Sequence, residues 1–213
     1  MNRTASRPGL ALVALAALAL AGCERNPLLV KRSACPAVAV ATYAGDATLF
    51  RPGTPVAASD AANVDVVATI TNVREECVET GEQFVTRITY DVVARRSDAG
   101  AARQVVLPVF SAVVQAGNVI NAKQISNVAV DFAVGQDRAA GRGQATTSVS
   151  RRAAAVPREI MDRISRDRRP GQIDAATDPM ADPEVRAALR AASFEVLIGF
   201  QLDDRALAYN VAK

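Results

Sequence analysis

The side chains best suited to covalent chemistry in this sequence are three cysteines, Cys23, Cys35 and Cys77. A thiol can be acylated, oxidised to a disulfide, or used as a nucleophile or metal ligand. The sequence contains no histidine, which excludes His-based catalytic triads, histidine metal ligands and the usual pH switch. The sequence around each cysteine therefore decides which use is expected.

Cys23 follows a segment with the composition of a secretion signal. Arg3 and Arg7 provide a basic start, and residues 10–21 are almost entirely Leu, Ala and Val. This stretch is too short to span a bilayer, which takes about 20 apolar residues. It ends in the tetrapeptide Leu-Ala-Gly-Cys at residues 20–23, where small residues before the cysteine suit a peptidase site that binds extended chain.

This arrangement resembles the lipobox of bacterial lipoproteins, which the lipoprotein signal peptidase processes. The resemblance covers residues 1–23. It implies that residues 1–22 are removed and that Cys23, as the mature N-terminus, carries the acyl chains. Several chains, at about 0.8 kcal/mol per buried methylene, would anchor the protein stably in a membrane. The alternative is an ordinary secretory signal, since Ala19-Leu20-Ala21 also fits an A-x-A cleavage site and would leave an exported soluble protein.

The resemblance also implies a location in the cell envelope. In lipoproteins of enteric bacteria an Asp after the lipidated cysteine favours retention in the inner membrane. Glu24 at that position therefore favours the outer membrane, facing the periplasm. Residues 23–34 are expected to form a tether. Two of the three net positive charges of the chain come from Arg3 and Arg7, so the basic pI does not indicate a nucleic-acid partner.

Cys35 and Cys77 remain if Cys23 is acylated, and an exported protein lies in an oxidising compartment. We predict a disulfide between them. It would close a loop of about 43 residues and contribute about 4 kcal/mol in the chain-entropy model. A redox pair or thiolate metal site is the alternative, but the sequence has no CxxC motif to support it.

A second candidate site is a cluster of seven arginines. One hypothesis is a surface helix that contacts anionic phospholipid, lipopolysaccharide phosphate or an acidic partner, because a guanidinium donates bidentately to phosphate. The favoured interpretation is a solvated helix that covers one face of a sheet. The arginines of this possible anionic-surface contact are Arg151, Arg152, Arg158, Arg163, Arg166, Arg168 and Arg169.

The remaining motifs predict neither an enzyme nor a cofactor. The acids Asp174, Asp178, Asp182 and Glu184 crowd one loop, but they lack EF-hand spacing and no metal site is expected. Gly141-Arg142-Gly143 is interpreted as a turn. We therefore expect a non-enzymatic envelope protein that binds or supports another envelope protein. A carrier of a small apolar ligand, with a cavity between sheet and helices, is the alternative.

The elements that must position these residues are mostly strands. Half of the residues are hydrophobic and only 4% are aromatic, so aliphatic side chains build the core. Phe84–Ala94 alternates clearly, and a turn at residues 79–82 precedes it. Pro108 argues for a bulge or an edge strand, and residues 135–143 are expected to form a glycine-rich turn. The expected strands are Ala37–Tyr43, Asp46–Phe50, Val64–Val73, Phe84–Ala94, Gln104–Val114, Val119–Gln124, Asn127–Val134, Gln144–Val149 and Phe194–Leu202.

This spacing of strands predicts a mainly β protein, an antiparallel β-sandwich of immunoglobulin-like or fibronectin-like architecture, over residues 35–213. Two helices, about 155–168 and 183–192, are expected between the last two strands. The last strand is apolar enough to lie inside a sheet. A short C-terminal helix should follow it, with Leu207 and Val211 facing inward.

Overall fold

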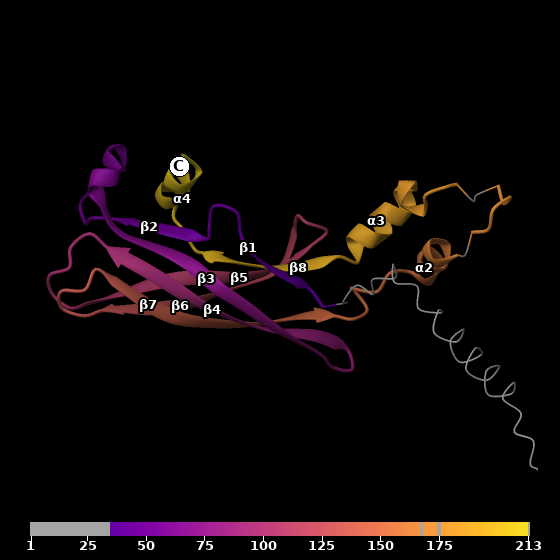
Figure 1. Cartoon of the computed structure of the whole chain (residues 1–213), viewed down its shortest axis with the longest axis horizontal. Helices are drawn as coiled ribbons and strands as arrows, with labels where there is room; N and C mark the ends of the chain where they lie inside the picture. Colours follow the sequence, from indigo (N-terminus) through magenta and orange to yellow (C-terminus); the bar gives the residue numbers. More distant parts are fainter. Residues whose placement is uncertain (1–34, 167, 174–175, 213) are drawn as a thin grey trace, which may run out of the picture. The chain divides into compact units, whose positions relative to one another are not determined.

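The computed structural model describes residues 35–166, 168–173 and 176–212 and confirms a mainly β sandwich of two sheets (Figure 1). Sheet A contains, in order across it, β1 (Ala37–Val40), β8 (Phe194–Phe200), β5 (Arg103–Gln115) and β6 (Val119–Phe132). Sheet B contains, in order across it, β2 (Asp46–Phe50), β3 (Val64–Glu79), β4 (Gln83–Arg96) and β7 (Arg138–Ser150). Neighbouring strands are antiparallel except for β1 and β8, which are parallel.

The core lies between the two sheets and follows the predicted alternation of β4. Every second residue of that strand, from Phe84 to Arg96, is buried. Opposite it, Val109 and Val113 of β5 and Ile198 of β8 belong to the same apolar cluster. The prediction that β8 lies inside a sheet is also confirmed, because β8 pairs with β1 on one side and β5 on the other.

The predictions for residues 119–149 are wrong in two places. Residues 119–132 form one strand, β6, rather than two, and β7 begins at Arg138 inside the predicted turn. The glycines mark close packing here instead of a turn. A Cβ on Gly143 would lie 2.3 Å from the ring of Tyr90, and a Cβ on Gly141 would lie 2.3 Å from the backbone oxygen of Ala129.

The expectation for Pro108 is also corrected. It lies on β5, which is an inner strand paired with both β6 and β8, and the register shift in β5 falls at Val113 and Val114. Proline is tolerated because the β8 pairing starts only at Val109. At residue 108 only an acceptor is needed, because the backbone N–H of Gln201, just after β8, donates to the Pro108 oxygen.

The two predicted helices lie between β7 and β8 and are shorter than expected. They are α2 (Arg158–Ser165) and α3 (Pro183–Ala191), with the 3-10 turn η3 (Pro179–Ala181) before α3. Two further 3-10 turns, η1 (Val56–Ala58) and η2 (Ala61–Asn63), fill the loop before β3. Asp182 caps α3 as predicted, since its carboxylate accepts from the Glu184 N–H.

The C-terminal helix α4 (Asp204–Ala212) is present, but its inward face is not the predicted one. Leu207 and Val211 are exposed, whereas Ala206 and Asn210 are buried. Asn210 takes the inner position because its amide donates to the backbone oxygens of Tyr43 and Asp46. The hydrogen bonds of Asn210 to residues 43 and 46 therefore contribute to the orientation of this helix.

Candidate functional site

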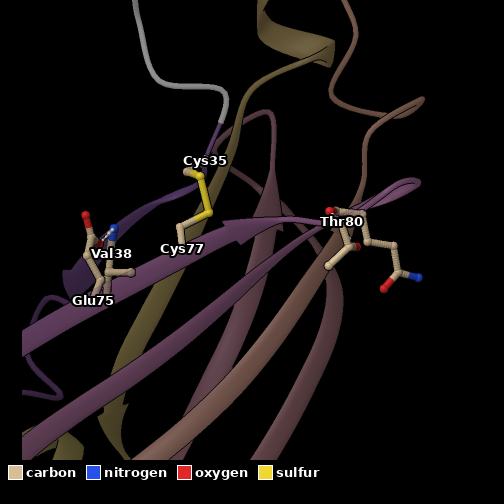
Figure 2. Close-up of a disulfide and its surroundings, with 6 residues drawn as sticks. Cys35, Val38, Glu75, Cys77 and Thr80 are labelled. Carbon is tan, nitrogen blue, oxygen red and sulfur yellow. Dashed lines mark hydrogen bonds between the residues drawn. A yellow bond between two sulfur atoms is a disulfide. The ribbon is translucent and has the colours of Figure 1, made fainter.

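The predicted disulfide between Cys35 and Cys77 is present (Figure 2). It joins Cys35, two residues before β1 at the edge of sheet A, to β3 of sheet B. Two residues away in β3, a carboxylate oxygen of Glu75 accepts a hydrogen bond of 3.1 Å from the Val38 N–H of β1. The start of the described chain is thus fixed to both sheets at the end of the sandwich where the β3–β4 hairpin turns.

Cys23 and the tether of residues 23–34 lie outside the described residues, as does the predicted signal of residues 1–22. Among the described residues, no helix is both long and apolar enough to cross a bilayer.

The seven candidate arginines do not form one helical face. Arg151 and Arg152 follow β7, Arg158 and Arg163 belong to α2, and Arg166, Arg168 and Arg169 come after α2 has ended. The expectation that the helix covers a sheet face is also wrong. In Figure 1, α2 and α3 lie beyond the end of the sheets, where the Gln115 amide donates to the backbone oxygen of Ala191.

Arg151, Arg168 and Arg163 are among the arginines held by the protein itself. Arg151 forms an ion pair with Glu79 at 2.7 Å and donates to the Gly81 oxygen. Arg168 donates to the backbone oxygen of Arg163 at 3.0 Å. These guanidinium groups stabilise the turns on which they lie.

Arg163 is the third and links the two helices. Its guanidinium donates to Asp182 at 2.9 Å and to Glu184 at 2.8 Å. The hydrogen bond to Glu184, followed by that to Asp182, raises the pKa of Arg163. The pKa of Asp182 is lowered, first by the Glu184 backbone N–H that it caps and then by Arg163. Both pKa shifts arise from contacts that stabilise the fold, namely the ion pairs of Arg163 and the cap of α3 by Asp182.

Arg152, Arg158 and Arg169 are exposed, and their side chains make no hydrogen bond or ion pair within the described part of the chain. Arg166 is exposed as well. The sequence predicts that the seven charges share one surface helix. In the structure they are spread over a turn, a helix and a loop.

The clefts of the described surface are open hollows. One, of about 280 Å³, is lined by polar side chains where β3 bulges away from β4, including Asn72, Asp91 and Arg142. The pKa of Asp91 is lowered, first by the hydrogen bond from Asn72 and then by the one from Arg142. Another, of about 460 Å³, lies beside β2 and α4, where Arg205 stacks on Phe50 at 4.2 Å. Within the described ranges, no three acidic or cysteine side chains are placed to hold a metal ion.

The largest feature that the sequence analysis missed is the outer face of sheet A. Val106, Phe110, Ile120 and Ile125 lie on it and alternate with the core residues of β5 and β6. The signal was present in β5, since residues 105–114 are almost all apolar. An antiparallel strand with one solvated face is expected to alternate instead.

Comparison with known proteins identifies no relative of this chain. No family model, no curated protein and no solved structure matches the chain.

Proposed function

We propose that this chain is a bacterial envelope lipoprotein, anchored through acylated Cys23 and acting as a non-enzymatic binding or assembly protein. The observation that carries the proposal is the order of basic residues, short apolar stretch and Leu-Ala-Gly-Cys in residues 3–23. Glu24 favours the outer membrane, facing the periplasm, and no cofactor is required.

The disulfide supports export to an oxidising compartment. Cysteines of cytosolic proteins are kept reduced, whereas disulfides persist in the periplasm. Cys35 and Cys77 are bonded to each other, so Cys23 is the cysteine left for acylation. This division of the three thiols matches the chemistry that the lipobox requires.

The tether then determines how far the folded domain can lie from the bilayer. Twelve residues, 23–34, precede Cys35, and an extended chain of that length spans about 40 Å. The disulfide and the hydrogen bond from Val38 to Glu75 fix the end of this tether to both sheets. A rigid domain held close to a membrane by a short tether suits a role in binding another envelope component.

The proposal is tested by expressing the chain in a Gram-negative bacterium with an alkyne-labelled fatty acid. We expect the label on the chain and the chain in the membrane fraction. The Cys23→Ser variant should lose both. A matched variant, Cys35→Ser/Cys77→Ser, changes the other two thiols and should keep the label. Label that persists on Cys23→Ser, or a wild-type chain that is unlabelled and soluble in the periplasm, contradicts the proposal.

The binding role needs its own experiment, because acylation shows only how the protein is held. Chemical cross-linking in intact cells, followed by purification in detergent, should recover an envelope protein with the wild-type chain. Recovery of no envelope protein from cells that contain the acylated chain would contradict that role while leaving the anchor intact.

A further inference from the structure

The outer face of sheet A carries several exposed apolar side chains on β5 and β6. Val106 is 50% exposed, Ile120 62% and Ile125 57%. Phe110 of β5 and Leu197 of β8 are half-buried on the same face. Exposed apolar side chains are common singly, but a contiguous patch across several strands of a soluble domain marks a contact surface.

Two opposite charges lie within this patch. Lys123 lies on β6 beside Ile125, and its ammonium stands 4.9 Å from the ring centre of Phe110. Glu195 lies on β8, is half-buried, and makes no hydrogen bond or ion pair within the described part of the chain. Its carboxylate is therefore available for an ion pair with a cation from outside the protomer.

The register separates the two charges within one protomer, and the described residues show no ion pair between them. Lys123 pairs with Ala112 of β5, whereas Glu195 pairs with Val114 of β5 from the other side. The two residues are therefore two strands and one outward-facing row apart, which is about 12 Å between Cα atoms. A positive and a negative group on either side of an apolar centre make the face self-complementary under a two-fold axis.

We propose that this face binds a second copy of the chain, with sheet A packed on sheet A. A two-fold axis along β5, between the facing sheets, brings Lys123 of each protomer beside Glu195 of the other. Phe110 and Leu197 then pack in the centre, and Ile120 and Ile125 pack on either side. The inference is independent of the lipid anchor, because it rests on the described surface alone.

The size of the patch predicts a weak and reversible dimer. Four strands about 4.8 Å apart and four outward rows about 7 Å apart cover about 540 Å² of flat area. Stable specific interfaces bury about 800 Å² of accessible surface per partner, and weak ones bury less. We expect a dissociation constant in the micromolar range for the chain in solution.

Pairing through the free edge of β6 is disfavoured by the same residues. β6 carries a register irregularity opposite Val113 and Val114, and Lys123 lies in the middle of the edge. Bulges and lysines are the devices that protect edge strands from pairing. An antiparallel pair of β6 edges centred on this region would also place two Lys123 side chains against each other.

The test uses the full-length chain, purified in detergent in light and ¹⁵N-labelled forms and then mixed. A zero-length carbodiimide reagent links an amine to a carboxylate only when they are in contact. We expect a cross-linked peptide between Lys123 and Glu195 that contains one light and one heavy partner. A chain that remains monomeric in the micromolar range and yields no mixed-isotope link would overturn the proposal.

Charge exchange provides the matched control. Lys123→Glu and Glu195→Lys should each raise the dissociation constant at least about tenfold, since like charges then face each other. The double variant Lys123→Glu/Glu195→Lys should return to within about threefold of the wild type, because the pairs are restored with reversed sign. A dimer unaffected by either single variant contradicts the proposal, as does a face that binds only vesicles or another protein.

Discussion

The two outer faces of the sandwich differ in the side chains that their inner strands present to solvent. On sheet B, β4 presents residues such as Arg87, Asp91 and Arg95 to solvent, and all three form ion pairs. On sheet A, β5 presents Val106 and Phe110 at the equivalent outward positions. Both sheets bury their inner faces in the same core. The difference shows that the fold alone does not require exposed apolar side chains on an outer face, which supports the proposed contact through sheet A.

The largest effect is expected where the two sheets are linked covalently. Cys35→Ser/Cys77→Ser removes the bond between the start of β1 and β3. The free energy of unfolding should fall by about 2–4 kcal/mol, because the loop between the cysteines is no longer closed in the unfolded chain. Denaturant titration measures it, and a reduced wild-type chain should match the variant. An unchanged midpoint would show that the disulfide does not stabilise the domain.

A smaller effect is expected where the sheets meet in the core. Gly143→Ala places a Cβ 2.3 Å from the Tyr90 ring, and this ring is buried against both sheets. We expect a loss of about 1–3 kcal/mol by thermal unfolding, as for other overpacked cores. Gly81→Ala is the control, because nothing lies within 4 Å of its Cβ position. Equal loss in both variants would contradict the close packing described here.

The two outer faces are compared directly by a matched pair of variants. Ile125→Ser on sheet A and Val93→Ser on sheet B each replace an exposed apolar side chain. Both should change the free energy of unfolding by less than about 0.5 kcal/mol, as surface substitutions do. Sedimentation velocity should show weaker self-association for Ile125→Ser alone. Equal association in both variants would remove the functional distinction between the faces.

The smallest effect concerns the polar face. The pKa of Asp91 is lowered by Asn72 and then by Arg142, so ionised Asp91 stabilises the folded state. That contribution is present above the unfolded pKa and is lost as the pH falls through the lowered folded value. Denaturation curves measured across the acid range should therefore show a shallower decline for Asp91→Asn than for wild type. A decline equal to that of wild type would contradict this origin of acid sensitivity.

The sequence predicted elements whose period is decided by burial on one face. β4 alternates from Phe84 onward, and Asp182-Pro183 marks the start of α3. It did not predict elements set by contacts distant in the chain. The glycines of β7 resemble a turn locally, but Tyr90 and β6 require them. Asn210 faces inward because of a loop more than 160 residues away.

The same limit applies to the candidate sites. The pairing of Cys35 with Cys77 follows from the number of thiols and the compartment, and the structure confirms it. The seven arginines looked like one surface because they are close in sequence. Their separation depends on where α2 ends and on the acids that hold Arg163, and neither is encoded in the local charge pattern.

The central claim is that lipid on Cys23 holds this domain at a membrane. Mass spectrometry of the N-terminal peptide, taken from the chain purified out of bacterial membranes, tests it most directly. The account predicts a peptide that begins at residue 23 and carries a diacylglyceryl mass on its sulfur. A peptide that begins at residue 22 with an unmodified thiol, the product of cleavage after Ala21, would contradict it.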